Sequence, residues 1–124
     1  MAKLVEVNPA ELGCINLHGI NMDKLRNVLR WFDMDAANHG FGLIDLRENP
    51  RSEGNLLILD GVHRSVVTHL RRVLIQGMLW ESSDEPDSPL ARVNFDRSPG
   101  LWITTSVLGK GSVQEIARGI RIDD

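Results

Sequence analysis

Glycine, proline and asparagine residues recur along the chain and divide it into short segments that share no internal repeat. The chain has 124 residues, which is the size of one ordinary domain. Hydrophobic residues make up 42% and charged residues 25%, so a core can form without a metal or a disulfide as a staple. We therefore expect residues 1–124 to fold as one domain of short helices and strands.

Hydrophobic spacing predicts a strand and a helix in the first third of the chain. Residues 14–17 are typical of a short strand, and Asp23 is placed to cap a helix that ends at Gly40. Trp31 would lie on the flank of this helix. Its buried face would consist of the apolar residues at helical spacing, which are Leu25, Val28, Leu29 and Phe32.

The middle of the chain predicts a hairpin followed by the longest helix. Two apolar runs, residues 41–46 and 55–59, enclose a polar segment and indicate a β-hairpin. Residues 62–80 then repeat apolar side chains at helical spacing, and Gly77 is expected to end this helix near Gln76. The predicted buried face of the second helix comprises Val66, Val67, Leu70, Val73, Leu74 and Met78.

The last third predicts a loop, a second hairpin and a short helix. Residues 81–89 have two prolines and no large apolar side chain, which indicates an exposed acidic loop. Residues 91–95 and 101–108 flank a turn-forming segment and predict the hairpin. Ser112 and Glu115 form a capping box for a helix that runs to about Arg118. Residues 120–122 are expected to add an edge strand after Gly119.

This order of elements predicts the α+β class, with an antiparallel sheet and two main helices on one face. The first six elements match the split βαβ order of ferredoxin-like sandwiches. A C-terminal hairpin and a short helix would complete the domain. The alternative is a winged-helix-like fold, with the long helix as the recognition helix and the following hairpin as the wing. The hairpin before that helix counts against the alternative, because a winged-helix fold requires a helix there.

Composition indicates a cytoplasmic protein. Cys14 is the only cysteine, so the chain has no internal disulfide, and its N-terminal residues lack the pattern of a secretory signal. The longest uncharged stretch, residues 98–109, is shorter than the roughly 20 apolar residues that a membrane span needs. The net charge of −3 and the pI near 5.8 argue against a surface that is uniformly basic for nucleic acid.

Charge is distributed unevenly along the chain. Residues 61–80 contain the three cations Arg64, Arg71 and Arg72 and no acid. The adjoining residues 81–89 contain the four acids Glu81, Asp84, Glu85 and Asp87. The arginines are expected on the helix side away from the apolar stripe, either as a solvated face or as a docking face for carboxylates or phosphates.

A second candidate site is the segment from Gly109 through Lys110 and Gly111 to Ser112, between a predicted strand and a capped helix. Backbone N–H groups in such a turn can bind an anion. The full phosphate-loop spacing is missing, so a connecting turn with an N-cap is the favoured interpretation.

No pattern in the sequence indicates catalysis, a cofactor or a metal. The four histidines, His18, His39, His63 and His69, lack metal-ligand spacing, and no serine lies in a nucleophile elbow. Cys14 is read as a small buried hydrophobe. Asp45 and Asp60, on neighbouring predicted strands, would form an acid–base pair only if the strand register brings them together.

The sequence therefore favours a non-enzymatic cytoplasmic protein that binds another protein. Its predicted role is that of an adaptor, a regulator or an inhibitor, of the kind that a phage or mobile element encodes. A homo-oligomer is one predicted form of assembly. The predicted contact residues are the charged side chains of both helices and the loop with a flanking tryptophan, namely Lys24, Arg26, Arg30, Arg64, Arg71, Arg72, Trp80, Glu81, Asp84, Glu85 and Asp87. One alternative is a nucleic-acid-binding transcriptional regulator that uses residues 62–76 and 91–108. Another is a small enzyme or anion-binding domain that uses the turn at residues 109–112.

Overall fold

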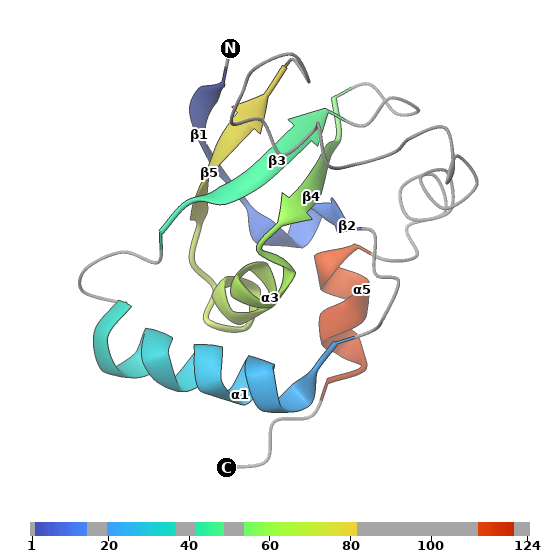
Figure 1. The fold of residues 1–124 in the computed structure, drawn as a ribbon. Coiled ribbons are helices and arrows are strands. Elements are labelled where there is room, and N and C mark those ends of the chain that lie inside the picture. The colour runs from blue at the N-terminus through green and yellow to red at the C-terminus, as the bar shows by residue number, and fades with distance from the viewer. Residues whose placement is uncertain (1, 15–19, 37–41, 49–53, 82–111, 121–124) are drawn as a thin grey trace.

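One mixed β-sheet with helices on one side forms the body of the protein (Figure 1). The computed structural model describes residues 2–14, 20–36, 42–48, 54–81 and 112–120. The strands are β1 (Lys3–Val7), β2 (Gly13–Cys14), β3 (Ile44–Glu48), β4 (Leu56–Asp60) and β5 (Ile75–Trp80). They lie in the order β1-β5-β3-β4-β2, so the strands at the two edges come first and second along the chain.

The helices are α1 (Met22–Trp31), α3 (Val62–Leu70) and α5 (Val113–Arg118), with a 3₁₀ turn, η1 (Pro9–Glu11), after β1. A π-helical turn, η2 (Phe32–Ala36), extends α1. Figure 1 shows α1 and α3 on the same side of the sheet, with α3 nearer to it. The α+β class is confirmed, and none of the described helices is long and apolar enough to cross a membrane.

The ferredoxin-like strand order is not confirmed. Strand β1 is antiparallel to β5, β5 is parallel to β3, β3 is antiparallel to β4, and β4 is parallel to β2. It follows that β4 and β5, which α3 connects, run in opposite directions with β3 between them. A split βαβ unit needs its two flanking strands to be parallel, so the helix connection here is of another kind.

The prediction of one helix over residues 62–80 is wrong, because α3 ends at Leu70 and β5 begins at Ile75. Strand β5 lies between β1 and β3, and pairing with both neighbours outweighs the local helical spacing. Gly77 belongs to this packing: a Cβ there would lie 2.9 Å from Leu46 Cδ1 and 3.0 Å from the Ile44 carbonyl oxygen. Gly77, which was expected to end the helix, therefore allows β5 and β3 to pack closely.

Helix α1 has the buried face that its spacing predicts, although its N-cap differs. Leu25, Leu29 and Phe32 are buried. The prediction of Asp23 as the cap is wrong, since the Asn21 side chain accepts a hydrogen bond from the Lys24 backbone N–H at 3.0 Å. Residues 37–40, over which the helix was expected to continue, lie outside the described residues.

The first predicted hairpin is confirmed, because β3 and β4 pair antiparallel with Leu46 opposite Ile58. Its first strand runs further than expected, through Arg47 to Glu48, and the register shifts between Asp45 and Leu46. The inner face of this hairpin, α1 and α3 enclose the core. The fully buried members of that core include Ile44, Leu46, Ile58, Leu25, Val66, Val67, Leu12 and Val113.

The predicted N-cap of the last helix, Ser112, is also confirmed. Ser112 Oγ accepts a hydrogen bond from the Glu115 backbone N–H at 3.2 Å, and Gly119 is the C-cap of α5. The second predicted hairpin and the edge strand beyond Ile120 lie outside the described residues, as do all but the first residue of the acidic loop.

Candidate functional site

The turn between α3 and β5 holds an arginine in an unusual backbone conformation. The Arg72 N–H donates to the His69 carbonyl at 3.1 Å, and the Val73 N–H donates to the Thr68 carbonyl at 3.0 Å. These two hydrogen bonds close the helix end as a Schellman motif, in which glycine usually takes the left-handed position. Here Arg72 takes it, with φ 58°, and no other non-glycine residue in the described part of the chain has a positive φ. For an L-residue this conformation costs roughly 1–2 kcal/mol.

Two large apolar side chains follow Arg72 and are exposed. Val73 is 40% exposed and Leu74 is 57% exposed, whereas the next residue, Ile75, is buried at 2%. The turn therefore presents Arg72, Val73 and Leu74 together before the chain enters the sheet. Exposed apolar side chains next to a charge offer area that a partner can bury.

A hollow of about 350 Å³ lies between this turn and the start of η1. The η1 side is well fixed, since Asn8 Oδ1 accepts a hydrogen bond from the Ala10 N–H at 3.1 Å and Pro9 is buried. The described residues that line the hollow are Asn8, Pro9, Ala10, His69, Arg72, Val73 and Leu74. We call these seven residues the turn surface.

The turn surface carries positive charge without a matching acid. Arg72 is exposed, and within the described residues its guanidinium takes part in no hydrogen bond or ion pair. His69 is the other titratable residue that lines the hollow, and none of the described lining residues is acidic. A carboxylate next to an apolar group would complement this arrangement, because a guanidinium donates to carboxylates as a fixed fork.

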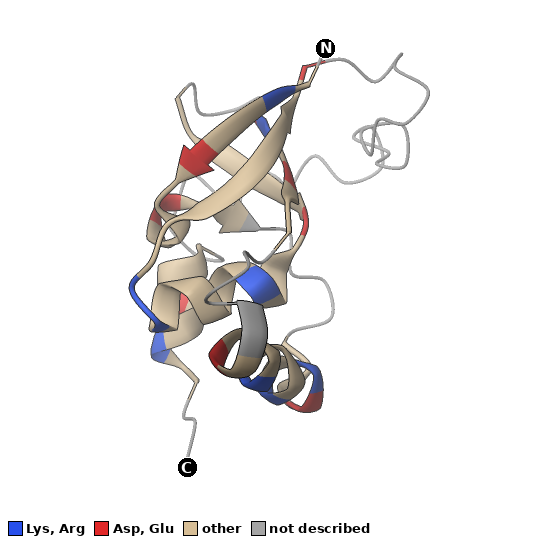
Figure 2. Cartoon of the chain, turned by 90° about the vertical axis from the view of Figure 1, so that its left-hand side faces the viewer, with Lys and Arg blue, Asp and Glu red and all other residues tan. Residues whose placement is uncertain are grey.

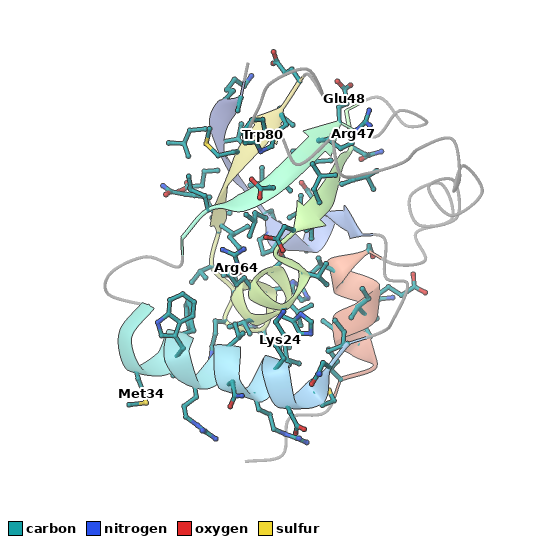
Figure 3. All side chains as sticks on the ribbon, viewed as in Figure 1. Lys24, Met34, Arg47, Glu48, Arg64 and Trp80 are labelled. Carbon is teal, nitrogen blue, oxygen red and sulfur yellow. The ribbon has the colours of Figure 1, made fainter. Side chains whose placement is uncertain are left out.

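The other two arginines of the predicted basic face have partners inside the protein. Arg71 forms a bidentate ion pair with Asp33, with Nε and Nη2 donating at 2.8 and 2.6 Å. The Arg64 side chain reaches from α3 toward the start of β3 (Figure 3), where its Nη1 donates to the Leu43 carbonyl at 3.0 Å. The three arginines therefore do not form one continuous binding face.

Helix α1 presents the cations that were expected on its outer side. Lys24, Arg26 and Arg30 are exposed, and Arg26 lies 3.5 Å from the Asp23 carboxylate on the same helix. Figure 2 shows both signs of charge along this helix. An exposed ion pair such as Arg26–Asp23 contributes well under about 1 kcal/mol.

Trp80 is tied into the sheet. It is half-buried, and its indole Nε1 donates to Asp45 Oδ1 at 2.9 Å. Neighbouring Arg47 donates from Nε to the Glu48 carbonyl at 2.8 Å, and burial lowers the pKa of Arg47, partly offset by Glu48 (Figure 3). Glu81 is exposed, whereas Asp84, Glu85 and Asp87 lie outside the described residues.

The acid–base hypothesis for two aspartates is partly met by the register, because Asp45 and Asp60 are paired across β3 and β4. Each carboxylate, however, has its own partner. Asp45 accepts from Trp80, and Asp60 lies 3.8 Å from Arg64 Nη2. The register therefore brings the two aspartates to paired positions, with Asp45 hydrogen-bonded to Trp80 and the Asp60 side chain 74% exposed.

His63 links α3 to the start of α1. Its Nε2 accepts a hydrogen bond from the Asn21 backbone N–H at 3.2 Å, which requires a neutral imidazole. Burial lowers the pKa of His63, and the nearby Lys24 lowers it further. The described residues contain no group of three metal-ligating side chains, and His18 and His39 lie outside them.

The turn at residues 109–112 gains no support as an anion site. Gly109, Lys110 and Gly111 lie outside the described residues, and the hydroxyl of Ser112 caps α5. A hollow of about 630 Å³ adjoins Ser112, and Glu11 is the only charged residue in its described lining. That lining offers an anion no complementary charge.

Sequence reasoning identified Arg72 but missed its apolar neighbours, because helical spacing placed Val73 and Leu74 in the core. Their position directly before a predicted helix end was the one available signal. The turn surface therefore combines a hollow, exposed apolar side chains and an arginine whose side chain has no partner among the described residues. The chain matches no known protein-family model and no curated protein sequence.

Proposed function

We propose that this protein binds another protein through the turn surface and acts as an adaptor, regulator or inhibitor. One observation carries the proposal: Arg72 lines a hollow of about 350 Å³ together with the exposed residues Val73 and Leu74. Arginine is one of the residue types enriched at interface hot spots, and the two exposed apolar side chains beside it offer area that a partner can bury.

The expected partner presents a carboxylate and an apolar side chain close together. Burial of an apolar side chain such as Leu74 favours association by roughly 1.5–3 kcal/mol before the entropy of association is subtracted. The carboxylate would pair with Arg72 and select against basic surfaces. Because Arg64 and Arg71 have internal partners, this chemistry supports a protein partner over a nucleic-acid backbone, which needs several adjacent cations.

Site-specific photo-crosslinking tests the proposal in the native cell. A photoreactive residue at Leu74 is expected to form a covalent adduct with a discrete protein, and the same residue at Gln114, exposed on α5, is not. Arg72→Glu should abolish the adduct, whereas the matched reversal Arg26→Glu on α1 should leave it. An adduct that tolerates Arg72→Glu, or one that contains nucleic acid, would overturn the proposal.

A further inference from the structure

Strand β1 lies at one edge of the sheet that the described residues form. Within the described residues its only strand neighbour is β5. An edge strand presents backbone N–H and C=O groups that can pair with an added strand.

The opposite edge of the sheet is protected in a way that β1 is not. Strand β2 has 2 residues, and Gly13 also forms a bridge with Ser112 at the start of α5. In contrast, β1 has 5 residues, contains no proline and pairs with β5 without a register shift. Its charges, Lys3 and Glu6, are its only described protection against strand addition.

The β1 edge leads directly to the turn surface. Val7, the last residue of β1, is paired with Ile75, the first residue of β5. Asn8, which follows Val7, and Leu74, which precedes Ile75, both line the hollow. One end of a strand added along β1 would therefore lie at this hollow.

Side chains along β1 alternate between the two faces of the sheet, so an added strand meets different neighbours on each face. Lys3, Val5 and Val7 are in register with Leu79, Gly77 and Ile75, and both valines pack against the core. Leu4 and Glu6 lie on the opposite face, where Leu4 is 59% exposed. An added strand therefore gains by placing an apolar group beside Leu4 and by avoiding an acid beside Glu6.

We propose that the partner contributes an extended segment that adds to β1 as a further strand and places an acidic group on Arg72 and His69. This inference rests on the proposed function and assigns its mode of binding. Backbone hydrogen bonds along β1 supply affinity, and the cationic hollow at the end of the strand selects an acidic terminus. A segment parallel to β1 delivers its C-terminal carboxylate to that hollow.

Hydrogen exchange with a designed peptide tests strand addition on the full chain. The probe has roughly eight residues, alternates valine and threonine, and ends in two C-terminal aspartates, so that it spans β1 and reaches the hollow. Binding is expected to slow amide exchange in residues 3–7 by about tenfold or more. The same peptide with asparagines and an amidated end should bind about tenfold more weakly, as should the acidic peptide with Arg72→Gln protein.

Leu4→Lys gives a second test that leaves the core intact, because this side chain is exposed. A lysine on an edge strand opposes strand addition, so peptide affinity should fall severalfold, whereas Leu43→Lys, which changes a similarly exposed leucine elsewhere, should not alter it. Protection confined to residues 8–10 and 69–74 would overturn strand addition and leave the proposed function standing. Failure of the peptide to bind would also overturn strand addition, and loss of the Arg72-dependent crosslink at Leu74 would overturn the proposed function itself.

Discussion

Arg71 and Asp33 form a bidentate ion pair that ties the end of α3 to the π-helical turn after α1, with N···O distances of 2.8 and 2.6 Å. Both side chains are partly exposed, at 40% and 46%. The pair fixes the last turn of α3, from which Arg72, Val73 and Leu74 extend to the surface. Arg71, which the sequence predicted as a contact with a partner, thus stabilises the turn surface through an ion pair within the protein.

Removal of this pair should destabilise the protein modestly. A double-mutant cycle of Arg71→Ala and Asp33→Ala is expected to give a coupling of about 0.5–1 kcal/mol, because exposed pairs are screened but bidentate geometry is favourable. Urea unfolding of the four proteins measures the coupling. It should shrink as salt is raised, and a coupling that is absent at low salt would contradict the role assigned to the pair.

Gly61 at the start of α3 is predicted to be essential for folding stability. Its φ is 114°, and a Cβ there would lie 2.3 Å from Ile44 Cγ2 in the core. Gly61→Ala should therefore lower the free energy of unfolding by at least about 3 kcal/mol, through backbone strain and overpacking together. Denaturant titration provides the measurement.

Gly54 supplies a matched control for this substitution. Its φ is also positive, at 86°, but no atom lies within 4 Å of the Cβ position. Gly54→Ala should lower the free energy of unfolding by about 1 kcal/mol, which reflects backbone strain alone. Equal losses for the two variants would mean that contact with Ile44 contributes nothing.

The partial burial of His63, together with the nearby Lys24, should make stability depend on pH. Because the folded pKa of His63 is lowered, the unfolded chain binds the proton more readily than the folded protein. The stabilisation is complete above the unfolded pKa, near 6.5, and is lost as the pH falls through the lower folded pKa. Protonated His63 can no longer accept from the Asn21 N–H, and it also gains repulsion from Lys24.

His63→Gln isolates this contribution, since glutamine can accept the same N–H but does not titrate. Urea midpoints for the native protein should fall between about pH 7.5 and pH 5.5, and the fall should be smaller in the variant. All other side chains are the same in the two proteins, so the difference between the two pH profiles reports on His63. Parallel pH profiles would show that His63 keeps the same pKa on folding.

Elements defined by neighbouring residues were predictable from the sequence. The buried face of α1 follows from apolar residues three and four positions apart, and the N-cap of α5 follows from Ser112 with Glu115 three positions later. The β3–β4 hairpin was predictable for the same reason, because its two apolar runs are close together in the chain.

Features that depend on distant residues were not predictable. Strand β5 pairs with β1, which lies some seventy positions earlier in the chain, and this pairing overrides a helical pattern that Val73, Leu74 and Met78 fit well. The partners of Arg64 and Arg71 are the Leu43 carbonyl and Asp33, which only the tertiary fold brings close. Sequence spacing therefore predicted that Arg64, Arg71 and Arg72 all face solvent or a partner. Of these three side chains, only that of Arg72 has no intramolecular partner among the described residues.

Arg72→Gly should separate stability from binding. Glycine adopts the left-handed conformation at this Schellman position without strain, so the variant is expected to gain roughly 0.5–1 kcal/mol in unfolding free energy. The same change removes the guanidinium, so the Leu74 crosslink and the affinity for the acidic peptide should both fall. Urea unfolding and peptide titration of one preparation test both effects, with Arg26→Gly as a control that lowers helix stability and spares binding. A protein that is more stable and still binds would show that Arg72 occupies a strained position without serving recognition.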